Sequence, residues 1–255
     1  MERSKLNWLV SDFRRATKLG IRYTSSQLGQ GKTGYRTPVV RSLEGARVVV
    51  IDPNNEAVYF RARLWKYTKQ PAKLIRIDRY SDMEKNDREP LRFSKGYTFA
   101  RAKPEHLFLY IHHLGDQSFL EFAVQNKVIQ PHIVWGDPLT ETSEVYGYRA
   151  DADAPFYQLS PEEVASQKEL HDPSTPSVWD IDLVAFSSVY DASHTQEDID
   201  QRIAVAESML RKARAQQKPA CVTIAQSQTP TPYVPADTLA YVRDKTLEMV
   251  ERVLR

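Results

Sequence analysis

Residues 46–78 decide the fold, because three patterns of apolar residues follow one another in their sequence, ARVVVIDPNNEAVYFRARLWKYTKQPAKLIRID. Residues 46–52 form a β-branched run typical of a buried strand, and residues 73–78 form a second such run. Between them, apolar residues recur at helical spacing: Ala57, Phe60, Leu64 and Tyr67. A strand, a helix and another strand in this order predict two parallel strands joined by a crossover helix.

The rest of the chain continues this alternation. Further strands are expected at residues 132–135, 177–186 and 220–225, and further helices at residues 117–128, 160–170, 195–217 and 236–254. The helix at 160–170 opens with a capping box, with Ser160 as the cap, Pro161 at the first helical position and Glu163 three residues on. The pattern predicts an α/β fold with a mainly parallel sheet and helices on both faces.

Two regions follow from this pattern. Residues 46–255 form the predicted α/β domain, and residues 1–45 precede it as a basic extension. The extension is predicted to contain a helix and a loop, since apolar residues recur at helical spacing near its start and residues 24–38 are rich in Gly, Ser and Thr.

Composition excludes several classes of protein. The chain has 255 residues, of which 41% are hydrophobic and 27% charged, as in globular domains. It contains no apolar run of the roughly 18–20 residues that cross a bilayer, and its first residues lack the apolar centre of a signal peptide. A single cysteine, Cys221, excludes an internal disulfide and a Cys-rich zinc site, and its place in an apolar run predicts an inert, buried thiol. A cytoplasmic location is expected.

Charge is unevenly distributed along the chain. The net charge of +2 is too small to indicate nucleic-acid binding, and neither nucleic acid nor a membrane is an expected partner. Residues 1–47 nevertheless carry ten basic residues against three acidic ones, a local excess of seven. This segment is either an ordinary solvated one or a docking surface for an acidic partner.

Acidic residues follow two of the predicted strands. Asp180 and Asp182 lie one residue apart, so their side chains project from the same face of a strand. Asp78 and Asp82 follow another strand, in which apolar residues flank Arg76. Ligands of parallel sheets bind outside the carboxyl ends of the strands. Four carboxylates gathered there would suit a hard cation such as Mn²⁺ or Mg²⁺, although an isolated Asp pair is also typical of loops and helix caps.

Five segments, in order, resemble the arginase-like family that includes the peptide arginases. They are VVVIDPNNEAVYF (48–60), LIRIDRYSDM (74–83), FLEFAVQNKVIQPHIVWGDP (119–138), VWDIDLVAF (178–186) and VTIAQSQTPTPYVP (222–235). The resemblance covers residues 46–255 and implies the three-layer arginase/agmatinase/deacetylase fold. It further implies two manganese ions bridged by a hydroxide, and hydrolysis of an arginine guanidinium to ornithine and urea.

The metal ligands of the family carry over in part. Family members have a Glu-Asp-His-Asn stretch, an Asp-x-His-x-Asp strand end and an Asp-x-Asp strand. Asp78, Asp82, Asp180 and Asp182 match these motifs, and the resemblance makes Asp78 and Asp180 the bridging, catalytic pair. Both histidines are replaced, the first by Asn54 and the second by Tyr80. Val184 also stands where a carboxylate is common in the family.

The two substitutions leave two outcomes open. Asn54 and Tyr80 are oxygen ligands of a weaker Mn²⁺ or Mg²⁺ site, or the metal has been lost. Asn is also a favoured helix N-cap, and a phenol with a pKa near 10 must lose its proton to bind metal well. Four carboxylates without a cation would be costly, which favours a retained metal. If both residues are ligands, restoring imidazoles at positions 54 and 80 is expected to strengthen Mn²⁺ binding.

Further candidate residues flank the predicted strands. His112 and His113 are candidates for general acid/base catalysis, although each is also typical of a structural or surface histidine. Candidates for substrate contacts come from segments at the carboxyl ends of strands: Asp137, Gln226, Ser227 and Tyr233.

Two functions therefore compete. The first is metal-dependent hydrolysis of a guanidino or related C–N bond, most simply in peptidyl arginine, with a peptide or arginine-like substrate. The second is a catalytically degenerate relative that binds a peptide or a partner. Asn54 and Tyr80 are the residues that discriminate between them.

Overall fold

The structure is a computed structural model of the whole chain. It describes residues 39–52, 54–80, 82, 107, 111, 119–136, 138–139, 144–146, 156–158, 172–191, 195–228 and 231–255. The helices predicted near the N-terminus and at residues 160–170 lie outside these residues, as do His112, His113 and Asp137.

A single sheet organises the described residues. Its eight strands lie in the order β1-β2-β8-β7-β3-β4-β6-β5. All neighbouring pairs from β2 to β6 are parallel, and the edge strands β1 and β5 are antiparallel to their neighbours. The strands are β1 (Val39–Leu43), β2 (Ala46–Ile51), β3 (Ala72–Ile77), β4 (Ile129–Gly136), β5 (Glu144–Tyr146), β6 (Phe156–Gln158), β7 (Ser177–Asp182) and β8 (Cys221–Ala225).

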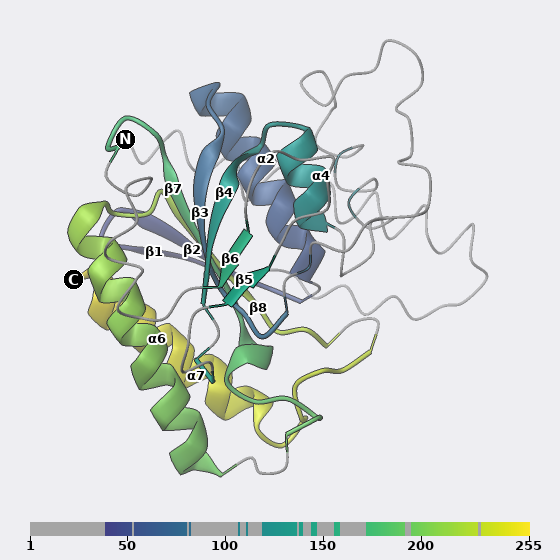
Figure 1. The fold of residues 1–255 in the computed structure, drawn as a ribbon. Helices are drawn as coiled ribbons and strands as arrows, with labels where there is room; N and C mark the ends of the chain where they lie inside the picture. The colour runs from purple at the N-terminus through teal and green to yellow at the C-terminus, as the bar shows by residue number, and fades with distance from the viewer. Residues whose placement is uncertain are drawn as a thin grey trace.

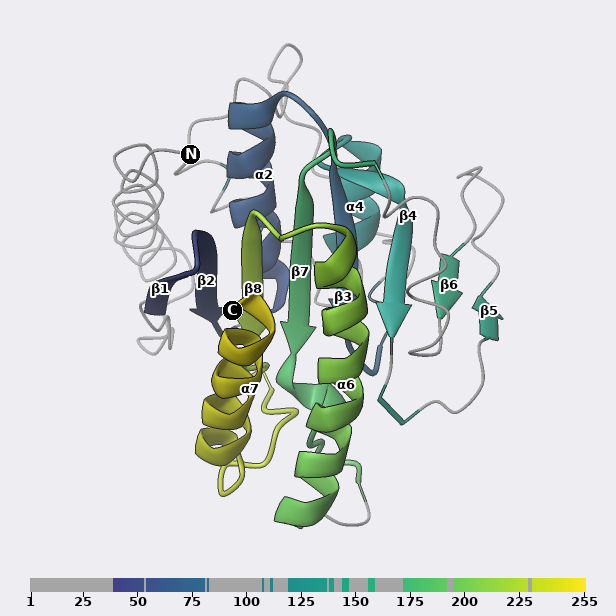
Figure 2. The same ribbon diagram turned by 90° about the vertical axis from the view of Figure 1, so that its left-hand side faces the viewer.

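Helices cover both faces of the sheet. α2 (Ala57–Thr68) and α4 (Phe119–Gln125) pack on one face, and α6 (Gln196–Gln216) and α7 (Leu239–Leu254) pack on the other (Figures 1 and 2). Alternating strand residues divide between two cores: Leu74 and Val178 face α2 and α4, whereas Ile75 and Trp179 face α6 and α7. The predicted three-layer α/β architecture is confirmed.

Local sequence accounts for the main helix boundaries. Thr195 caps α6, its hydroxyl accepting a hydrogen bond from the backbone N–H of Asp198 at 3.2 Å. A short 3₁₀ turn, Asn54–Glu56, leads from β2 into α2, which ends at Lys69 in the left-handed conformation. None of the described helices has both the length and the apolar character that crossing a bilayer requires.

Four predictions of strands differ from the structure. The sequence did not predict the short strands β5 and β6, and β4 begins at Ile129, before the predicted start at residue 132. The other two differences concern β1 and β7. β1 lies within the segment assigned to the extension, and a turn with positive φ at Glu44 and Gly45 pairs it with β2. The sheet therefore begins at residue 39, before the predicted boundary at residue 46. The strand predicted at residues 177–186 ends at Asp182, because Asp182 caps a 3₁₀ turn, Leu183–Ala185, by accepting from the backbone N–H of Val184.

Candidate functional site

The register of β3, β7 and β8 places charged and polar residues in one row. Arg76 on β3 is the neighbour of Asp180 on β7, and Asp180 is the neighbour of Thr223 on β8. Residues two positions further along a strand project from the same face, so Asp78 and Asp182 lie on this face as well. It is the face that α2 and α4 cover. The cluster lies towards the carboxyl ends of the strands, as the sequence predicted.

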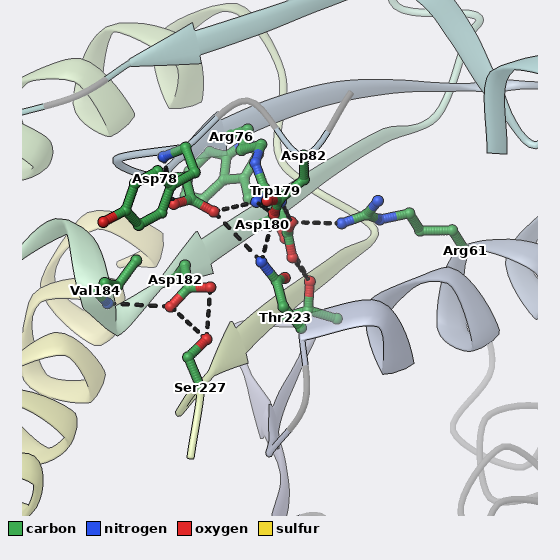
Figure 3. Close-up of polar contacts among 12 residues, drawn as sticks. Arg61, Arg76, Asp78, Asp82, Trp179, Asp180, Asp182, Val184, Thr223 and Ser227 are labelled. Atoms are coloured by element: carbon green, nitrogen blue, oxygen red, sulfur yellow. Dashed lines mark hydrogen bonds and ion pairs between the residues drawn. The ribbon is translucent and has the colours of Figure 1, made fainter. Parts of the chain in front are cut away.

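Arg76 lies at the centre of the cluster and is completely buried. Its Nη1 donates to Asp180, and its Nη2 donates to both Asp78 and Asp82 (Figure 3). Burial lowers the pKa of Arg76, but the surrounding aspartates outweigh that effect and raise it. The guanidinium is therefore a permanent cation inside the group of carboxylates.

A second buried guanidinium reaches the same group. Arg61, on α2, extends its Nη2 to within 2.6 Å of Asp180 Oδ2. Both guanidinium groups lie over the buried ring of Phe119, with the Cζ of Arg61 5.8 Å and that of Arg76 5.3 Å from the ring centroid. Such contacts stabilise cations that have been removed from water. Thr223 completes the surroundings of Asp180 by donating from Oγ1 to Oδ1 at 2.5 Å.

The remaining carboxylates are held by neutral donors. Asn54 donates from Nδ2 to Asp82 Oδ2 at 2.8 Å and to Asp78 Oδ2 at 3.4 Å. Asp82 has positive φ, a conformation that Asp tolerates better than most residues. Asp182 accepts from the Ser227 hydroxyl at 2.8 and 2.7 Å and from the backbone N–H of Val184 at 3.0 Å.

The pKa values of the four aspartates follow their surroundings. Burial raises the pKa of Asp78 to about 6, although Arg76 opposes the shift. Burial also raises the pKa of Asp82 and of Asp182 well above their usual range, and neighbouring carboxylates add to this. For Asp180, burial is outweighed by Arg61 and Arg76, so its pKa is lowered. The raised pKa values reduce the total negative charge of the four carboxyl groups, so that it comes closer to balancing the positive charge of the two guanidinium groups.

The structure thus brings the four predicted aspartates and Asn54 together, but Tyr80 takes a different role. Its backbone N–H donates to Asp78 Oδ1 at 2.9 Å, while the residue is 41% exposed. Burial raises the pKa of the Tyr80 phenol, although Arg79 opposes the shift, so the group stays a neutral phenol near pH 7. A neutral phenol on an exposed residue is a poor metal ligand.

Three of the residues predicted to contact substrate lie on the segment that follows β8, and their observed contacts are with other residues of the chain: Gln226, Ser227 and Tyr233. Ser227 is buried against Asp182, and Gln226 is buried with its backbone N–H donating to Ile51. Tyr233 packs against the core on the α6 and α7 side, and its backbone N–H donates to Ser227. These hydrogen bonds and packing contacts stabilise the segment, and contact of the same residues with substrate stays a prediction.

The site residues that sequence reasoning missed are Arg76 and Arg61. The signal for Arg76 was present, because an arginine inside an apolar run and two residues before Asp78 shares the face of that aspartate. Arg61 gave no such signal on its helix.

The predicted docking surface for an acidic partner needs one correction. Arg47, which was counted among the ten basic residues of that segment, is buried on β2 and is not part of the surface.

The donor set does not fit a pair of manganese ions. Three of the four aspartates direct an oxygen at Arg76, and Asn54 presents its N–H₂ group to Asp78 and Asp82. Metal binding needs lone pairs at these positions, where the structure has hydrogen-bond donors. Within the part of the chain that the structure describes, no group of three or more His, Cys, Asp or Glu residues is arranged to hold a metal ion.

Comparison with known proteins bears on the fold. No family profile and no curated protein matches the sequence. Among solved structures, a hypothetical agmatinase from Burkholderia thailandensis superposes with a TM-score of 0.50 at 12% identity, over 81% of this chain and 58% of that one. The fold is arginase-like.

A second solved structure is similar over a comparable length. Proclavaminate amidino hydrolase from Streptomyces clavuligerus matches with a TM-score of 0.45 at 13% identity, over 82% of this chain and 64% of that one. This chain therefore spans less than two thirds of either structure. At such identities the similarity concerns the fold, and the function has to be argued from the site.

Proposed function

We propose that this chain is a catalytically degenerate arginase-like protein, which binds a peptide or protein partner and does not hydrolyse a C–N bond. One observation carries the proposal: the buried Arg76 guanidinium contacts Asp78, Asp82 and Asp180. A divalent ion bound to the same oxygens would lie beside a permanent positive charge among buried side chains, where bulk solvent screens the repulsion only weakly.

The surface around the site supports a binding role. Large hydrophobic side chains are exposed on the segments that follow three neighbouring strands: Tyr80 after β3, Leu139 after β4, and Val189 and Tyr190 after β7. Tyr190 is 68% exposed. Exposed apolar side chains on segments that follow neighbouring strands would suit contact with another molecule.

The basic segment supplies a second proposed contact. Its excess of positive charge would favour a partner with acidic groups. Within the described residues this segment contributes β1 and the start of β2. The proposal therefore assigns partner contacts to these exposed apolar side chains and, separately, to the basic segment.

Hydrolysis of a guanidino C–N bond, in arginine or peptidyl arginine, is the competing candidate. It is favoured by the convergence of Asp78, Asp82, Asp180 and Asp182, which is the arrangement that a metal site of this fold would need. The two candidates differ in one respect that can be measured, because only the hydrolase needs a metal ion to activate water.

Urea release decides between them. The purified full-length protein is incubated with Mn²⁺ and with arginine, agmatine or an arginine-containing peptide, and urea is measured over hours. We expect none above the level of a heat-denatured sample. Urea release that requires Mn²⁺ and is lost in Asp180→Asn would refute the proposal in favour of the hydrolase.

A further inference from the structure

Arg76 fills the position of a cation. It is the cross-strand neighbour of Asp180 and lies two residues before Asp78, so its side chain starts on the face that carries the carboxylates. Its two terminal nitrogens reach Asp78, Asp82 and Asp180 (Figure 3). The residue has no exposed surface. The planar fork of a guanidinium is suited to contact several carboxylates at once.

The surroundings hold this guanidinium in place. The Phe119 ring lies under it, and Arg61 shares Asp180 with it. If Arg76 left the cluster, Asp180 would keep Arg61, but Asp78 and Asp82 would lose the guanidinium that contacts both, which is costly in a buried site. A metal ion added to the protein would have to displace a group that is part of the chain.

Asn54 is oriented to match the guanidinium. It directs its Nδ2 at Asp78 and Asp82, whereas its Oδ1 is buried and has no hydrogen-bond partner. An amide that bound a metal ion would present the oxygen instead. With Arg76 removed, a half-turn of this amide would direct the free oxygen at the cluster.

We infer that Arg76, and not the replacement of the two imidazoles, is what keeps divalent cations out of this site. The inference rests on the proposed function and deepens it. The aspartates are then an intact set of cation ligands, and the cation that occupies them is an arginine of the same chain. It follows that restoring imidazoles at positions 54 and 80 while Arg76 is present does not restore metal binding.

Four proteins test this inference: the natural chain, Arg76→Met, the double variant Asn54→His/Tyr80→His, and the triple variant that combines all three changes. Mn²⁺ binding is measured by titration calorimetry and by the electron paramagnetic resonance signal of the free ion. We expect no saturable binding by the natural chain or the double variant. Arg76→Met should show saturable Mn²⁺ binding, with a Kd at least about 100-fold below the highest Mn²⁺ concentration at which the natural chain shows none, and the triple variant should bind more tightly still.

Folding of Arg76→Met is checked by circular dichroism, and Arg76→Gln is a second neutral variant that keeps a hydrogen-bond donor. If either folds only when Mn²⁺ is added, the metal has replaced the guanidinium and the inference is supported. Binding by the double variant with Arg76 in place would overturn the inference, as would a lack of binding by both Arg76 variants and the triple variant. The proposed function fails separately, through Mn²⁺-dependent urea release by the natural chain.

Discussion

Replacing Arg76 by Met should be among the most destabilising single changes on the buried face of the sheet. Met keeps an unbranched apolar chain but ends before the guanidinium, so the change removes the charge together with its hydrogen bonds. The change leaves Asp78, Asp82 and Asp180 in a buried site without the guanidinium that contacts all three. Breaking a buried ion pair by removing one partner costs about 3–5 kcal/mol.

The contacts in the cluster explain why the cost should fall in this range. One pair of unit charges about 4 Å apart contributes roughly 4 kcal/mol at an effective dielectric constant near 20. Three such contacts would exceed the range, but carboxyl groups left without the cation take up protons, which limits the loss. Arg61 also stays beside Asp180, at 2.6 Å. For a protein of this size, about 3–5 kcal/mol corresponds to a fall in Tm of roughly 6–20 °C.

Thermal and urea denaturation, followed by circular dichroism near pH 7.5, measure this loss. Arg211→Met is the matched control, because Arg211 forms an i,i+4 ion pair with Glu207 on α6 and its side chain is 53% exposed. Exposed pairs of this kind contribute only about 0.3–0.5 kcal/mol. The reasoning is refuted if Arg76→Met lowers the free energy of unfolding no more than Arg211→Met does.

Three further predictions concern other described residues. The pKa of Asp78 in the folded protein, about 6, lies above its ordinary value of 3.8, so between these values the folded state binds more protons than the unfolded state, and stability is lost as the pH rises through that window. Urea denaturation at about pH 5 and pH 7 should therefore show a smaller free energy of unfolding at pH 7. A larger value at pH 7 would contradict the shift. Burial raises the pKa of the Cys221 thiol to about 12, so iodoacetamide should modify it only after the protein unfolds, which mass spectrometry detects; rapid labelling of the folded protein would show that the thiol is accessible. Ser227→Ala removes the side-chain hydrogen bonds to Asp182 and should lower the free energy of unfolding by about 1–3 kcal/mol. The control Ser174→Ala removes an exposed hydrogen bond to Asp172 and should have a much smaller effect. Equal losses in the two variants would contradict the role given to Ser227.

Much of the fold could be predicted from periodicity in the sequence. The runs that form β2, β3 and β8 are short and rich in Val, Ile and Leu, and α6 begins at a Thr cap. The edge strand β1 was missed because its five residues, VVRSL, follow a Gly-, Ser- and Thr-rich sequence and show no regular apolar alternation, and β5 and β6 were missed because three residues are too few for a pattern. The end of β7 was misplaced because the apolar residues of the 3₁₀ turn that Asp182 caps continue the pattern of the strand.

The site was predictable only in part, for a physical reason. Alternation along a strand puts Asp180 and Asp182 on one face, and the topology of a parallel sheet brings them near Asp78 and Asp82. The contact between Arg76 and Asp180 depends on the register of two strands whose residues are 104 positions apart, and a single sequence does not give that register. The orientation of the Asn54 amide is likewise set by neighbours that only the folded chain brings together.

The identity of the cation among the aspartates is the central claim, and crystals grown with MnCl₂ test it most directly. Anomalous diffraction locates manganese without reference to the protein atoms. We predict no anomalous peak among Asp78, Asp82, Asp180 and Asp182, and electron density for the Arg76 guanidinium in contact with three of them. A manganese peak bound to these carboxylates, with the Arg76 side chain turned away, would contradict the account.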